Sequence, residues 1–194
     1  MSDKENKVQF NLKNVHYALL TETVTATGTT YAFGTPVRVP GAVNLNLEQQ
    51  GSIQKFYADG IVYYKAAQNN GYEGDLEMAR FIDKMMQEIW GAKLGATSKV
   101  LTEYNNVEPK AFALLFQIDG DEDNDLYVLY NCVGTRPAIS SKTNEETKEP
   151  VTQSSTISAT ALEDGRVMAR TTAETPDSIK NAWFTKVFEE SDAA

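Results

Sequence analysis

Residues Phe56 to Trp90 read FYADGIVYYKAAQNNGYEGDLEMARFIDKMMQEIW, and the hydrophobic pattern changes twice within this segment. An apolar run at 61–64 contains β-branched and aromatic residues, which favours a strand. The Asn-Asn-Gly sequence at 69–71 then predicts a turn, because Asn and Gly tolerate a positive φ.

From residue 72 onward the pattern alternates with a period of two, which is characteristic of a strand. One face carries Tyr72, Gly74, Leu76 and Met78, and the other carries Glu73, Asp75, Glu77 and Ala79. The alternation predicts a strand with three carboxylates in a row on one side of a sheet. Glu73, Asp75 and Glu77 are called the acidic row below.

Helical spacing replaces the alternation near residue 81, where the apolar positions are Ile82, Met85, Met86 and Ile89. Asp83 would lie in the first turn, where a negative charge suits the helix dipole, and Gly91 would follow the last turn. In a rival interpretation the helix begins earlier, with Asp75 as its N-cap. We favour the strand because its alternation is longer and because Gly74 would weaken a first helical turn. In either case one amphipathic helix covers a sheet.

The composition limits both the class of protein and its chemistry. The 194 residues suffice for a single domain, 1–194, and the net charge of −9 argues against binding nucleic acid through its phosphates. With one cysteine, Cys132, and one histidine, His16, a single chain can form neither a disulfide nor a zinc site of the usual ligands. The first ten residues lack the apolar region of a secretory signal, and no apolar run reaches transmembrane length. We therefore expect a protein that is made in the cytoplasm and has no membrane partner.

Strand patterns dominate the rest of the chain. We predict strands at 8–25 with a kink at 13–14, at 42–47, 99–104, 111–118, 126–132, 156–161 and 166–171, and an edge or irregular extended segment at 31–39. The 111–118 run is apolar enough to be buried on both faces, and Asp164-Gly165 predicts a tight hairpin between the last two strands.

The C-terminal segment 175–194 is predicted to form a helix and a tail, with Thr175 as N-cap and Pro176 at the first helical position. Together these elements predict a mainly β fold. We expect an antiparallel β sandwich or barrel with one flanking α-helix and a short C-terminal helix.

The acidic sequence 119–125 lies between two predicted strands that form a hairpin. An EF-hand loop beginning at Asp119 would need Gly at its sixth position and Glu at its twelfth, where this chain has Asn124 and Tyr130. The flanking segments are also predicted strands and not helices. We expect a solvated turn, with an incidental weak cation site as the alternative.

Two segments are too polar to bury much apolar surface, and we predict a flexible arm at 1–6 and a mobile loop at 136–152. The chain has no Gly-rich phosphate loop, no G-x-S-x-G motif and no paired cysteines. His16 is expected to be a hydrogen-bonded strand residue, because no acid or nucleophile motif accompanies it. From the residues alone we expect a binding or assembly module, with no catalytic, metal or cofactor site.

Several segments resemble the phi13-type family of major tail proteins, from long-tailed phages and prophages of Gram-positive bacteria. The segments are KNVHYALLTE (13–22), TPVRVPGAVNLNLE (35–48), FYADGIVYY (56–64), NNGYEGDLE (69–77), PKAFALLFQIDGD (109–121), LYNCVGTRP (129–137) and NAWFTKVF (181–188). They follow the order of the family and span nearly the whole chain. Ile82 departs from the pattern, because the family often places Pro before an acidic residue at the start of the helix.

The resemblance implies a tail tube protein. Such proteins form hexameric rings that stack into a hollow conduit through which DNA leaves the capsid, and sheets of neighbouring subunits join into one lining. It implies as partners further copies of the chain, a tape-measure protein in the lumen, and the tail terminator and distal tail or baseplate proteins. DNA would pass without specific binding, no cofactor would be needed, and the protein would reside in the virion. The alternatives are a distal tail ring, a secretion-type tube subunit, or a monomeric binding module.

The resemblance also suggests roles for particular residues. The acidic row would face the lumen, where like charge keeps DNA from binding. Inter-ring contacts are expected from the hairpin 26–39 and the loop 136–152, with the candidates Gly28, Thr29, Tyr31, Arg38, Arg136, Lys142 and Lys148. Trp183 and Phe184, adjacent on the final helix and pointing to different sides, are candidates for packing between subunits.

Overall fold

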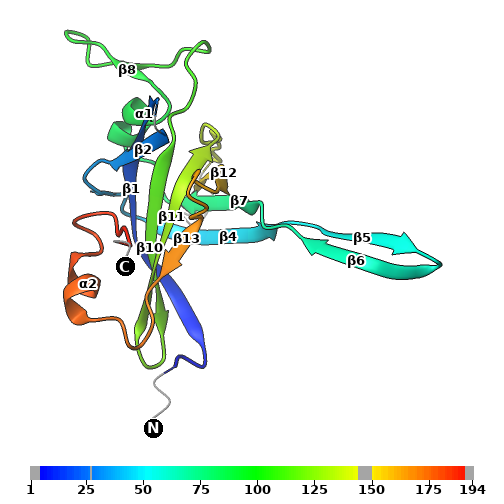
Figure 1. Cartoon of the computed structure of the whole chain (residues 1–194). Helices are drawn as coiled ribbons and strands as arrows, with labels where there is room; N and C mark the ends of the chain where they lie inside the picture. The colour runs from blue at the N-terminus through cyan, green and yellow to red at the C-terminus, as the bar shows by residue number, and fades with distance from the viewer. Residues whose placement is uncertain (1–4, 27, 144–149, 191–194) are drawn as a thin grey trace.

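The protein is mainly β, with one large antiparallel sheet and two short helices (Figure 1). The structure, a computed structural model, describes residues 5–26, 28–143 and 150–190. Its elements are β1 (Gln9–Thr25), β2 (Gly28–Phe33), β3 (Val37–Arg38), β4 (Ala42–Gln50), β5 (Ile53–Ala58), β6 (Ile61–Ala67), β7 (Gly71–Met78), α1 (Asp83–Glu88), β8 (Lys93–Leu94), β9 (Leu101–Thr102), β10 (Phe112–Gly120), β11 (Asn124–Gly134), β12 (Gln153–Thr160), β13 (Met168–Arg170) and α2 (Asp177–Ala182).

The main sheet has nine strands, and its principal order is β2-β1-β10-β11-β12-β7-β4. Strand β3 pairs with β1, and β13 pairs with β11. The predicted kink in the first strand is confirmed, because Asn14 has φ 50° and the pairing register shifts between Lys13 and His16. The prediction of a mainly β, antiparallel fold is confirmed. The sandwich or barrel type is not shown, because no sheet in the described part of the chain closes.

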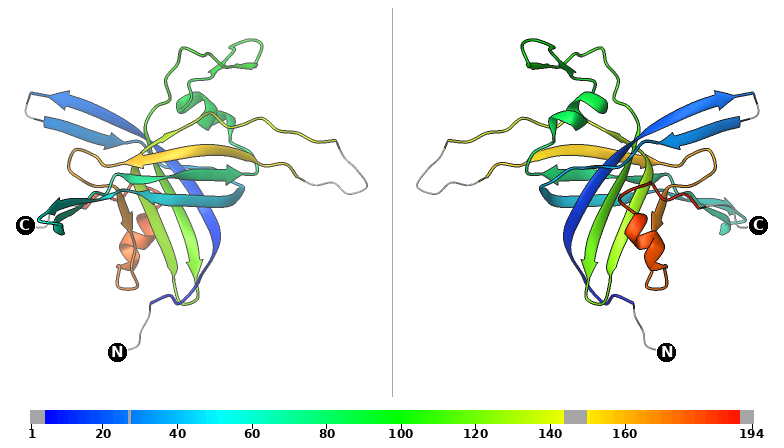
Figure 2. Two further views of the ribbon diagram at one scale, coloured as in Figure 1. Left: turned by 90° about the vertical axis from the view of Figure 1, so that its right-hand side faces the viewer. Right: turned by 90° about the vertical axis from the view of Figure 1, so that its left-hand side faces the viewer.

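The principal hydrophobic core draws on both halves of the main sheet. Strands β4, β7 and β12 run crosswise to β1, β10 and β11 (Figure 2), and residues of both groups belong to one buried cluster. Helix α1 covers this cluster through Met85, and Trp90 follows the helix with its indole Nε1 donating to the Gly134 carbonyl oxygen at 2.8 Å. The predicted helix is thus confirmed, and Gly91 after it has the expected positive φ of 68°.

A second hydrophobic cluster lies on the other face of β1, β10 and β11. Strand β10 alternates between the two clusters, with Leu114 in the first and Ala113 and Leu115 in the second. This confirms the prediction that the 111–118 run is buried on both faces. Ile179 of helix α2 packs against the second cluster, and Trp183 and Val187 of the chain after the helix are buried in it.

Two local predictions in the C-terminal third are wrong. Strands β12 and β13 do not form a hairpin with each other, because both pair with β11, β12 at 131–134 and β13 at 127–129. The Asp-Gly turn does form, with Gly165 at φ 88°, but it is part of a loop between two strands that follow one edge of β11. The N-cap of α2 is Pro176 and not Thr175, whose Oγ1 instead accepts a hydrogen bond from the Thr172 amide at 2.9 Å.

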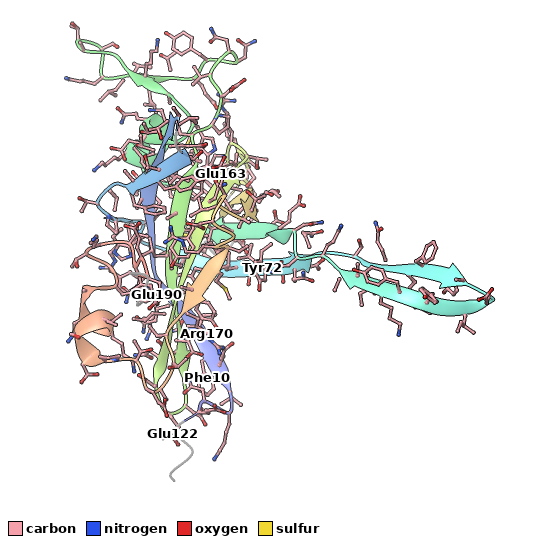
Figure 3. The ribbon with its side chains drawn as sticks, in the orientation of Figure 1. Phe10, Tyr72, Glu122, Glu163, Arg170 and Glu190 are labelled. Carbon is pink, nitrogen blue, oxygen red and sulfur yellow. The ribbon has the colours of Figure 1, made fainter. Side chains whose placement is uncertain are left out.

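The acidic sequence 119–125 forms the turn of the β10–β11 hairpin, at the lower end of the molecule near Glu122 (Figure 3). Asn6 closes this turn, because its Oδ1 accepts from the amides of Glu122 at 3.1 Å and Asp123 at 2.9 Å. Asn6, predicted to belong to a flexible arm, is therefore held against the body, and residues 1–4 lie outside the described residues. No group of acidic, His or Cys side chains within the described ranges is arranged to hold a metal ion.

Candidate functional site: the polar face of strands β4, β7 and β12

The acidic row lies on β7, in the interior of the main sheet between β4 and β12. Leu76 and Met78, on the opposite side of β7, are buried in the principal core. The alternation predicted from the sequence is confirmed, and the rival helix starting at Asp75 is wrong, because α1 begins only at Asp83.

The neighbouring strands place small polar residues beside each carboxylate. Glu73 lies between Glu48 and Ser158, Asp75 lies between Asn46 and Thr156, and Glu77 lies between Asn44 and Ser154. We call these nine residues the polar face. Four of them are carboxylates, five are neutral hydroxyl or amide residues, and none is Lys or Arg.

Hydrogen bonds hold part of the acidic row in place. The Thr156 hydroxyl donates to Asp75 Oδ1 at 2.8 Å, and the Thr152 hydroxyl donates to Glu77 Oε1. Glu73 differs, because its direct cross-strand neighbour Glu48 is also exposed and carries the same charge. Like charges directly opposite each other destabilise a sheet, so this pair lowers the free energy of unfolding.

The polar face is suited to repelling a polyanion and not to binding one. Its carboxylates create a negative potential, and no ion pair with a basic side chain neutralises them within the described residues. Hydroxyl and amide groups keep the surface hydrated without supplying the positive charge that phosphate contacts require.

His16 and Cys132 have structural environments. His16 Nδ1 donates to the Asn14 carbonyl oxygen at 2.7 Å, its ring stacks on Phe184, and burial lowers its pKa from the ordinary value of 6.5. The expected hydrogen-bonded strand residue is therefore confirmed. Burial raises the pKa of the Cys132 thiol to about 12, which makes it a poor nucleophile at neutral pH.

The inter-ring candidates of the first hairpin lie on β2 and β3. Gly28 and Arg38 are exposed, whereas Thr29 and Tyr31 are half-buried. The Tyr31 hydroxyl oxygen accepts a hydrogen bond from the Glu163 amide at 3.0 Å, which ties the hairpin to the Asp-Gly loop. Gly28 and Arg38 thus remain accessible for contacts with another molecule.

Arg136 has a role within its own chain. Its guanidinium donates to the carbonyl oxygens of Tyr104 at 2.9 Å and Val107 at 3.0 Å, and it lies 2.6 Å from a carboxylate oxygen of Glu103. These contacts fix the segment 103–107 against the body. Of the other candidates in this loop, Lys142 is exposed and Lys148 lies outside the described residues.

Trp183 and Phe184 both pack within their own chain. Trp183 is buried in the second cluster, where its Nε1 donates to the Tyr127 carbonyl oxygen at 3.2 Å and its ring stacks on Phe188. Phe184 is half-buried and stacks on His16 with ring centroids 4.6 Å apart. Phe184 also packs against the second cluster, and both residues follow α2, which ends at Ala182, so the predicted placement on the helix is wrong. The contacts of both rings lie within their own chain.

Sequence reasoning did not find a long two-stranded arm formed by β5 and β6, which we define as residues 53–67 (Figure 1). The available signal was Asp59-Gly60, whose φ angles of 52° and 77° suit a tight hairpin turn. The 61–64 strand was predicted, but its partner strand and its separation from the core were not.

Comparison with known proteins gives no match, either to a family model or to the sequence of a curated protein. Neither of the helices in the described ranges has the length and apolar character needed to cross a membrane.

Proposed function

We propose that this chain is the major subunit of a phage tail tube, assembling into stacked hexameric rings that form the DNA conduit of a long, non-contractile tail. The observation that carries the proposal is the polar face. A conduit for DNA needs a surface that is acidic, hydrated and free of basic side chains, so that the polyanion slides without binding.

The position of the polar face in the sheet supports the same conclusion. The opposite side of β4, β7 and β12 is buried in the principal core, so these strands present their only solvated face as one polar surface. Strands β4 and β2 end the main sheet. Open edges of this kind favour pairing with another chain, and joining β4 to a neighbouring copy would extend the polar face around a ring.

The crossed halves of the sheet are also compatible with the sandwich-type architecture that the family resemblance implies. Such a subunit would act with a tape-measure protein in the lumen and with terminator and distal tail or baseplate proteins at the tube ends. It would reside in the virion after synthesis in the host cytoplasm, and it would catalyse no reaction.

Electron microscopy of the purified protein across a range of concentrations tests the proposal. We expect hollow tubes of uniform diameter that lengthen without a fixed end. Assembly that stops at one ring would favour the second candidate, a distal tail ring. A monomer at every concentration is the result expected of a monomeric binding module and would count against both.

A further inference from the structure

The arm, residues 53–67, extends away from the body as an isolated pair of strands (Figures 1 and 3). None of its residues belongs to either hydrophobic cluster. A two-stranded hairpin in water is at best marginally stable by itself. An extended arm of this kind therefore gains from being covered by something else.

The side chains of the arm are those of an interface and not of a solvated ribbon. Its exposed large apolar residues are Ile53, Phe56, Tyr57, Ile61, Val62, Tyr63 and Tyr64. The four aromatic rings are 60% (Phe56), 61% (Tyr57), 72% (Tyr63) and 63% (Tyr64) exposed. They leave on the order of 500 Å² open to solvent. A standard protein interface buries about 800 Å² on each partner, and the rings supply a large share of that area. They are divided between the two faces of the ribbon, because consecutive residues such as Phe56 and Tyr57 point to opposite sides.

The charge of the arm indicates what covers it. Lys55, Asp59 and Lys65 are its charged residues and give it a net charge of +1, so the remainder of this chain, with −9 overall, carries −10. Lys55 and Lys65 lie directly opposite each other, which is unfavourable in an isolated hairpin. Neither forms an ion pair with a described residue. Carboxylates of a partner would relieve this repulsion.

We propose that the arm docks on the acidic body of a second copy of this chain, with its aromatic rings buried and its two opposed lysines paired with carboxylates of that copy. This inference deepens the proposed tube function by naming the element that joins subunits. It also assigns the contact to residues other than the hairpin 26–39 and the loop 136–152.

Two full-length variants test the docking by sedimentation velocity over a range of concentrations. The first, Phe56→Ser/Tyr63→Ser/Tyr64→Ser, removes the rings, and we expect at least about tenfold weaker self-association because buried aromatic anchors dominate interfaces. The second, Lys55→Glu/Lys65→Glu, keeps the rings and reverses the charge. It should also weaken association, and added salt should reduce the difference from the wild type.

The control removes apolar side chains from the other projection of the molecule, the β8–β9 loop. Leu94→Ser/Val100→Ser changes residues that are 47% and 59% exposed and should associate as the wild type does. All three variants should keep the wild-type unfolding temperature, because the altered residues belong to neither cluster.

Electron microscopy of the same samples separates this inference from the tube proposal. Tubes formed equally well by the ring-deletion variant would overturn arm docking and leave the tube proposal intact. Small oligomers of the wild type that disappear in both arm variants would support arm docking and overturn the tube. A wild type that stays monomeric would overturn docking on a second copy.

Discussion

Replacing Glu73 by Gln should stabilise the folded subunit, although it removes a charge from the proposed functional surface. Glu73 and Glu48 are exposed, directly opposed carboxylates on β7 and β4. The substitution keeps the size of the side chain and removes the repulsion between them. A cross-strand like-charge pair costs about 0.2–1 kcal/mol, so we expect the free energy of unfolding to rise by about this amount.

The gain is measurable by urea unfolding and by the thermal midpoint, which should rise by no more than about 2–4 °C for a chain of this size. It should shrink as ionic strength is raised, because surface repulsion is screened. Glu22→Gln is a matched control, since Glu22 is an exposed strand carboxylate that faces Tyr31 and not another acid. Its effect should stay within about 0.5 kcal/mol.

A loss of stability in Glu73→Gln, or a gain that does not depend on salt, would refute the reasoning. The expected result would show that the carboxylates of the polar face are retained against folding stability. Charge kept at such a cost is what a surface selected for repelling DNA should display.

Three further predictions follow from other contacts. Trp90→Phe should lower the free energy of unfolding by roughly 2–4 kcal/mol in urea titrations. The smaller ring leaves a cavity, and the buried Gly134 carbonyl oxygen loses its hydrogen-bond donor. A loss below about 1 kcal/mol would contradict this account. Burial lowers the pKa of His16, so the unfolded chain binds a proton more readily than the folded chain, and the free energy of unfolding should fall as the pH drops below 6.5. His16→Gln should reduce this pH dependence. An unchanged slope of the free energy of unfolding against pH would contradict the role given to His16. Neutralising the whole acidic row to Gln, Asn and Gln should slow DNA exit from assembled tails without changing tube length, and unchanged exit kinetics would exclude a role for these charges.

The clearest sequence predictions concern patterns confined to a few neighbouring residues. The alternation of β7, the helical spacing of α1 and the kink at Asn14 were all predictable and are confirmed. Each of these features depends on the order of side chains within a few neighbouring residues of one element. The sequence predicted only part of the polar face. It shows the acidic row, but it does not show which residues of β4 and β12 lie beside each carboxylate.

Tertiary structure alone decided which strands meet. The Asp-Gly turn at 164–165 forms locally, but β11 is long enough for β12 and β13 to pair along one edge, so no hairpin results. Arg136 begins a segment whose polar composition predicts a mobile loop. In the folded chain its guanidinium donates hydrogen bonds to three backbone carbonyl oxygens within 90–107.

The sequence by itself therefore determined the period of each element, the acidity of one strand face and the place of most turns, because these depend on neighbours within a few residues. The partners of each strand, the burial of Trp183 and the exposure of the aromatic arm depend on contacts between residues far apart in the chain. Hydrophobicity alone cannot distinguish the aromatic residues of β6 from core residues, and only the folded chain shows that the core leaves them outside.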